Sequence, residues 1–143
     1  MKKLFSLLLT VLMVLTLAAC GNEPADDHND VNSGSPKDLT VLTAEEACHE
    51  LYHILGEPDK LVGTEIKMSG EYVALEGTEA GVVYHICVVS DPDTGESQGM
   101  EFILMDGAVY PDLSDTFTLA GTLEIYEENG DHYCHLVDAE IVD

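Results

Sequence analysis

The feature that most limits the fold of this chain is the alternation of apolar and polar residues that begins after Pro58. In the clearest run, one face is apolar and consists of Phe117, Leu119, Gly121, Leu123 and Ile125. A period of two residues is typical of a β-strand with one buried face. Strands are therefore expected at residues 65–75, 82–89, 100–105, 116–126 and 133–142, with turns rich in Gly and Asp between them.

Two long predicted strands each contain a central glycine, Gly70 in the first strand and Gly121 in the fourth. Glycine inside a strand permits a tight bend, and five short strands with such bends favour a small barrel of the OB type. A helix is predicted over residues 44–55, because Thr43 and Glu46 have the spacing of a capping box and apolar residues follow at helical intervals. The sequence thus predicts a mainly β fold, an OB-like five-stranded antiparallel barrel preceded by one α-helix. The alternative is a flat α+β sheet beneath the helix.

The first residues of the chain have the parts of an export signal. Lys2 and Lys3 precede an apolar run over residues 4–17, which is shorter than the roughly 20 residues of a membrane-spanning helix. The run ends in Leu17-Ala18-Ala19-Cys20, an arrangement that resembles the lipobox of bacterial lipoproteins. This resemblance implies that residues 1–19 are removed as a lipoprotein signal peptide and that Cys20 carries diacylglycerol with fatty acids such as palmitate. We therefore expect a lipid anchor on the outer, extracytoplasmic side of the cell membrane.

The cleaved chain is strongly acidic. Residues 20–38 are predicted to be the lipidated cysteine and a disordered acidic tether, because they hold almost no large apolar side chain, and residues 39–143 are predicted to be one globular domain. Three lysines and 28 acidic residues follow residue 19, which gives a formal charge of −25. This charge repels nucleic acids, whose binding needs Lys and Arg. The expected partners are the membrane, through the anchor, and a transporter or envelope protein, with no nucleic acid.

Short motifs of the globular part resemble a group of small OB-fold lipoproteins that is found mainly in Gram-positive bacteria. The motifs are Gly70-Glu-Tyr72, Tyr84-His-Ile-Cys87, Gly99-Met-Glu-Phe102, Tyr110-Pro111, Ala120-Gly-Thr122, Tyr126-Glu127 and Tyr133-Cys134. The resemblance implies an OB fold and a role in metal handling. The chain departs from the group at the Cys-Cys pair, which would fall on Gly95 and Glu96, and neither residue is a thiolate ligand. The family-like polar positions that are left are Tyr84, Cys87, Glu101 and Cys134.

Four residues are candidate ligands of a soft metal ion: His85, Cys87, His132 and Cys134. Each His-Cys pair is two residues apart on a predicted strand and so projects to one face, and thiolate with imidazole suits zinc or copper. His49 and His53 are four apart and share a face of the predicted helix. Two structural alternatives stay open: a Cys87–Cys134 disulfide beside a free Cys48, or three cysteines buried as small apolar residues.

An enzyme is not expected, since the chain has no phosphate-binding glycine loop and no arginine to hold an anion. Residues 91–95 are expected to form an ordinary turn rather than a calcium loop, because Phe102 stands where a bidentate Glu would be needed. The predicted function is a non-enzymatic, membrane-anchored binding or accessory module for metal handling or transport. The alternative is an interaction domain for a protein or glycan, whose sign would be an exposed aromatic patch at Tyr72, Tyr84 or Tyr110.

Overall fold

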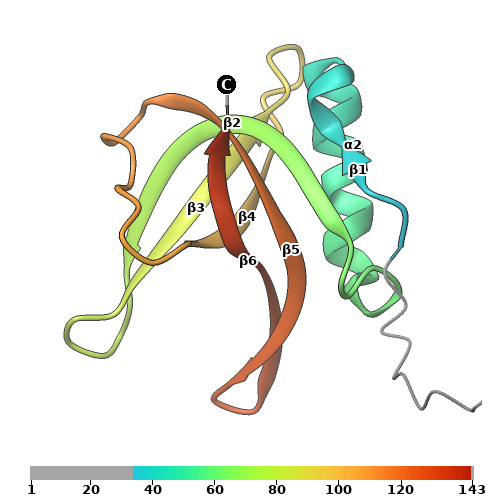
Figure 1. The fold of residues 1–143 in the computed structure, drawn as a ribbon. Coiled ribbons are helices and arrows are strands. Elements are labelled where there is room, and N and C mark those ends of the chain that lie inside the picture. The colour runs from blue at the N-terminus through green and yellow to red at the C-terminus, as the bar shows by residue number, and fades with distance from the viewer. Residues whose placement is uncertain (1–33, 143) are drawn as a thin grey trace, which may run out of the picture.

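The computed structural model describes residues 34–142, which form one helix and a six-stranded mixed sheet (Figure 1). The elements are β1 (Lys37–Asp38), η1 (Leu39–Val41), α2 (Ala44–Gly56), η2 (Pro58–Lys60), β2 (Glu65–Glu76), β3 (Val83–Ser90), β4 (Ser97–Leu104), β5 (Thr116–Glu128) and β6 (Asp131–Val142). The mainly β prediction with one preceding helix is thus confirmed. Among the described residues, no helix has the length and apolar character needed to cross a membrane. The predicted signal peptide and Cys20 lie outside the described residues.

Helix α2 begins where the capping box predicted it. The Thr43 hydroxyl accepts from the backbone N–H of Glu46 at 3.3 Å, and the Glu46 carboxylate accepts from the backbone N–H of Thr43 at 2.9 Å. These two bonds satisfy donors that the first helical turn leaves without partners. The buried face of the helix, which contacts β3 and β4, consists of Ala47, Cys48, Leu51 and Ile54.

The five long strands close into a ring in the order β2-β3-β4-β6-β5, with β5 pairing back to β2. The prediction that all pairings are antiparallel is wrong for one pair, because β4 and β6 run parallel, with Glu101 opposite His135 and Phe102 opposite Leu136. The physical reason is parity. A ring in which every neighbour is antiparallel needs an even number of strands, so a five-stranded ring must contain at least one parallel pair.

Strand β2 bends so that it can serve two partners. Its first half pairs with β5 and its second half with β3, and the change of partner falls at Gly70 and Glu71. The bend is the green arch in Figure 1. A Cβ atom on Gly70 would lie 2.5 Å from the Val88 carbonyl oxygen and 2.7 Å from the Cys87 sulfur. The bend predicted at Gly70 therefore requires glycine, because no side chain fits between the crossing strands.

The first residues of the domain lie inside the predicted tether. Lys37 and Asp38 form β1, which pairs parallel with Ile66 and Lys67 of β2, and the Lys37 ammonium lies 2.6 Å from the Glu50 carboxylate. The globular part therefore includes residues that the sequence assigned to the tether. The interior of the ring is filled by apolar side chains of all five strands, among them Met68, Cys87, Phe102, Leu119, Leu123 and Leu136.

Replacing Gly70 by Ala is expected to lower the free energy of unfolding by about 1–3 kcal/mol, because the added methyl group must displace the Val88 backbone or the Cys87 side chain. The matched control is Gly56→Ala, since nothing lies within 4 Å of a Cβ at the last residue of α2 and Ala favours a helix. Urea unfolding followed by circular dichroism measures both. Equal midpoints for Gly70→Ala and the wild-type chain would contradict the close approach at the bend.

Candidate functional site

His85 is half-buried on the interior face of β3 and packs against other aromatic side chains. Its Nδ1 is 2.7 Å from the Tyr72 hydroxyl, and its ring stacks on Tyr110 with centroids 3.6 Å apart. Phe102 and Phe117 complete this internal cluster. Burial lowers the pKa of His85. The imidazole is thus used in packing and hydrogen bonding with its aromatic neighbours.

The three cysteines are free thiols, so the disulfide alternative is wrong for this structure. Cys87 is fully buried, and burial raises the pKa of its thiol to about 12. Cys134 is half-buried, and its pKa is raised by burial and then by the nearby Glu101 carboxylate. Cys48 is buried on the helix. The alternative of buried apolar cysteines is thus confirmed for Cys48 and Cys87.

The structure does not gather the predicted metal ligands. His85 belongs to the internal aromatic cluster, Cys87 to the core, and His132 is exposed near the start of β6. Within residues 34–142, no group of three or more His, Cys, Asp or Glu side chains is arranged to hold a metal ion. His49 and His53 do share a helix face, with ring centroids 4.5 Å apart. The geometry therefore gives no support to a zinc or copper site at these positions.

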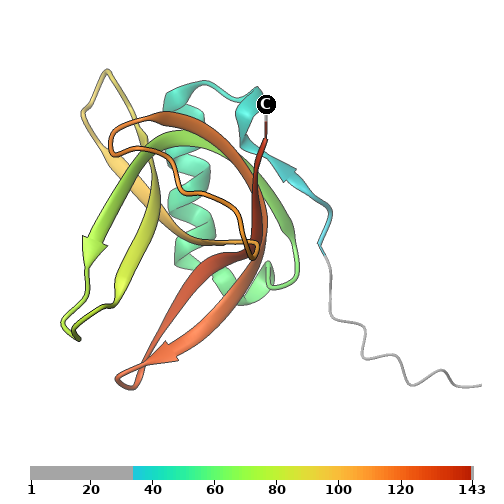
Figure 2. The ribbon, with the colours of Figure 1, turned by 60° about the vertical axis from the view of Figure 1, so that its left-hand side comes forward.

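A groove lies between the two long hairpins. The β2–β3 and β5–β6 hairpins extend from the same end of the ring in both views (Figures 1 and 2). Two adjoining cavities of about 600 and 450 Å³ lie here and share Ile86, Glu101 and Tyr133. We call this surface the tyrosine groove, and its central residues are Tyr84, Ile86, Glu101, Tyr126, Glu128 and Tyr133.

Two tyrosine–carboxylate hydrogen bonds fix the groove. Tyr84 on β3 donates to Glu128 on β5, and Tyr126 on β5 donates to Glu101 on β4, each at 2.6 Å. The bond to Glu128 is the main cause that raises the pKa of Tyr84 to about 12. Burial, followed by the bond to Glu101, raises the pKa of Tyr126. Both phenols therefore stay protonated donors at physiological pH and hold the carboxylates in place.

Aromatic stacking supports the same residues from β6. The Tyr126 ring stacks on Tyr133, with centroids 5.6 Å apart, and on His135, with centroids 4.6 Å apart. Tyr133 is 46% exposed, whereas His135 is 9% exposed and its buried Nδ1 has no hydrogen-bond partner within the described part of the chain. The groove thus has a fixed aromatic wall with an exposed outer ring.

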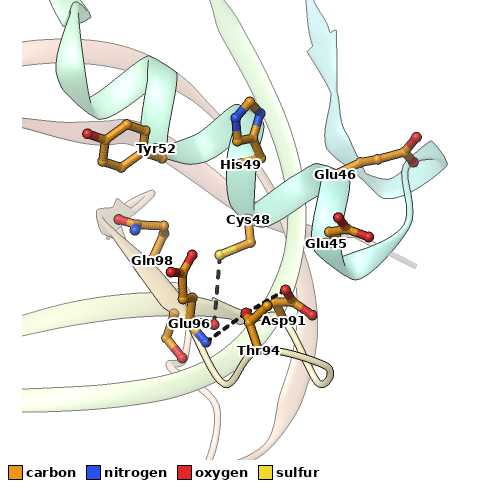
Figure 3. Close-up of a pocket in the computed structure, with 10 residues that line it drawn as sticks. Glu45, Glu46, Cys48, His49, Tyr52, Asp91, Thr94, Glu96 and Gln98 are labelled. Carbon is orange, nitrogen blue, oxygen red and sulfur yellow. Dashed lines mark hydrogen bonds between the residues drawn. The ribbon is translucent and has the colours of Figure 1, made fainter.

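A larger cavity of about 840 Å³ lies between the start of α2 and the β3–β4 loop (Figure 3). Its floor is a turn in which the Asp91 carboxylate accepts from the Asp93 backbone N–H at 2.8 Å and from the Thr94 hydroxyl at 2.6 Å. The Cys48 sulfur lies 3.8 Å from the Glu96 carbonyl oxygen. The predicted ordinary turn is confirmed. Because the Asp91 carboxylate is used within its own loop, this cavity is a weaker candidate than the tyrosine groove.

Sequence reasoning found only part of this site. Of the three tyrosines proposed for an exposed patch, Tyr84 lines the groove, whereas Tyr72 is 5% exposed and Tyr110 packs against the core. Tyr126 and Tyr133 were missed as site residues. The sequence did contain a signal for Tyr126. The buried positions of β5 are odd-numbered, so the alternation places Tyr126 on the opposite face of the strand.

Comparison with protein-family models, with curated proteins and with solved structures gives no match for this chain. The likeness of the motifs to a lipoprotein group therefore stays a resemblance. Any function has to be inferred from the residues of the chain and from their geometry.

The cysteines are expected to differ in their rates of alkylation. Cys87 should react more than about a hundredfold more slowly in the folded chain than after denaturation, because it is buried and its pKa of about 12 leaves almost no thiolate. Cys134, which lines the groove, should be modified first. Iodoacetamide pulses at pH 8 followed by peptide mass spectrometry measure the rates, with urea-unfolded protein as the control. Rapid modification of Cys87 in the folded chain would contradict its position in the core.

Proposed function

We propose that this chain is a lipid-anchored, extracytoplasmic binding module and that the tyrosine groove of an OB-like barrel is its binding surface. The observation that carries the proposal is the position of the groove. It lies on β3 and β4, the second and third of the five long strands along the chain, and it is flanked by the β2–β3 and β5–β6 hairpin turns. OB folds bind their ligands on this face and between these two loops.

The groove is suited to binding rather than to catalysis. Its carboxylates accept hydrogen bonds from tyrosines that hold them still, which lowers the entropy cost of engaging a ligand. Its thiol, Cys134, is a weak nucleophile because its pKa is raised. A non-enzymatic role therefore fits the chemistry of the groove. A protein or a glycan is the kind of ligand proposed, with a transporter or envelope protein as the expected partner.

The anchor places this module at the membrane surface. The lipobox-like Leu17-Ala18-Ala19-Cys20 supports export and lipidation, and two acyl chains suffice for stable attachment. The acidic domain is repelled by anionic lipid headgroups. The groove is therefore proposed to face partners in the envelope rather than the lipid surface. The resemblance also implies a role in metal handling. The positions of His85, Cys87, His132 and Cys134 do not support that role.

Probe binding tests the groove as the site. We expect at least one of three probes, a neutral oligosaccharide, a basic peptide or an acidic peptide, to shift the amide NMR signals of β3 and β4 next to Tyr84 and Glu101. The Tyr133→Ala change should weaken that binding by about tenfold, because it removes an exposed ring of the groove. The control is Tyr52→Ala, which removes an exposed ring of the other cavity. Shifts confined to that other cavity, or no binding of any probe, would contradict the proposal.

Changing Cys20 to Ala is expected to abolish lipidation, because the thioether that carries the lipid cannot form. Labelling of the chain by a palmitate analogue in cells should therefore stop. Cys134→Ala serves as the control, since it removes a different thiol and leaves the lipobox-like sequence intact. Labelling that persists in the Cys20→Ala variant would show that the lipid is attached elsewhere.

A further inference from the structure

We infer that the ligand of the tyrosine groove is an extended segment of a partner protein that carries lysine or arginine side chains. This inference rests on the proposed function and names the chemical class of its ligand. It follows from the charge, the hydrogen bonding and the shape of the groove.

The two glutamate carboxylates of the groove can accept further hydrogen bonds. Glu128 accepts from Tyr84 through Oε1, and Glu101 accepts from Tyr126 through Oε2. Among the described residues, the second oxygen of each carboxylate has no hydrogen-bond partner. An ionised carboxylate can accept several hydrogen bonds, and those from a charged donor are about twice as strong as neutral ones. Two fixed acceptors are therefore available to a ligand that donates.

Among the described residues, no lysine lines the groove, and its basic side chain is that of His132. Four carboxylates line it, those of Asp59, Glu76, Glu101 and Glu128. Two of the three lysines of the described chain form ion pairs elsewhere, Lys37 with Glu50 at 2.6 Å and Lys60 with Glu57 at 2.8 Å. The third, Lys67, lies opposite Asp38 in the β1–β2 pairing and helps to lower the pKa of that carboxyl group. The negative potential of the groove is thus not neutralised within the described residues, and it selects a cationic ligand over an anionic one.

The aromatic side chains suit the same ligand. Tyr133 is 46% exposed and Tyr126 stacks behind it, so a guanidinium or ammonium group can lie over a ring close to the Glu101 carboxylate. Cation–π contacts of this kind contribute about 0.5–2 kcal/mol, and Arg also stacks flat on aromatic rings. A neutral sugar would use the rings but would leave the charge of the groove uncompensated.

The length of the groove favours a polypeptide segment over a single amine. Its two cavities run from the end of α2, at Leu55 and Pro58, to the β2–β3 turn at Gly77. In an extended chain, side chains that point the same way are about 7 Å apart, so one segment can present two basic groups to separate carboxylates. The apolar floor at Ile86 can take the methylene stems of those side chains.

The test is a titration of a labelled nine-residue peptide with alternating Lys or Arg residues into the lipidated protein in detergent micelles, followed by fluorescence anisotropy. Changing Glu101 and Glu128 to Gln should weaken binding by at least about tenfold, because Gln keeps the shape and an acceptor for each tyrosine but removes the charge. The matched control changes Glu45 and Glu96 to Gln in the other cavity, which alters the net charge equally, and should weaken binding by less than about twofold.

The outcomes separate this inference from the proposed function. Equal weakening in the two double variants would mean that only net charge attracts the peptide, which overturns the inference. Binding of a neutral oligosaccharide in the groove without binding of the basic peptide would also overturn it, while the groove would stand as the binding site. A Tyr133→Ala variant, changed at an exposed position, keeps the test informative if the double variant does not fold, and it should also bind the basic peptide about tenfold more weakly.

Discussion

Strand β2 pairs with β5 along its first half and with β3 along its second half, and this double pairing closes the ring. The strand must turn where the partners change, and the backbone of β3 passes so near to Gly70 that no side chain fits there. Both hairpins extend from one end of the ring (Figure 2), and residues of both line the groove. The geometry of the candidate site therefore depends on the strand pairing that closes the ring.

The sequence predicted the elements of this fold well, because each element is determined by local periodicity. The alternation before Gly121 fixed which face of β5 is buried, and the spacing of Thr43 and Glu46 fixed the start of α2. The order of the strands around the ring was not predictable in this way, because the residues of β4 do not indicate which strand will pair with it. The parallel pair follows once a closed ring of five strands is assumed, so it was deducible from parity rather than from any residue.

The candidate site was harder to predict than the fold because spacing along a strand shows only which residues share a face. His85 and Cys87 do share a face, but that face is the interior of the ring, where the Tyr110 ring stacks on the imidazole and the Cys87 sulfur would lie 2.7 Å from a Cβ at Gly70. His132 and Cys134 line the groove instead, so the two His-Cys pairs lie in different parts of the structure. The tyrosines of the groove come from β3, β5 and β6, and only the register of those strands brings them together.

The geometry of the groove shows which of the many acidic residues can act on a ligand there. Electrostatic screening at physiological ionic strength limits the reach of exposed charges to about 8 Å, so most of the net charge cannot act at the groove. What a ligand meets there is set by nearby carboxylates, and Glu101 and Glu128 are held by the phenols of Tyr126 and Tyr84. With the proposed lipid anchor, the distributed charge of the domain repels anionic lipid headgroups, which favours an orientation with the groove turned away from the lipid. In the proposed function, affinity and orientation thus have separate sources: affinity comes from two fixed glutamates in the groove, and orientation comes from the diffuse negative surface around it.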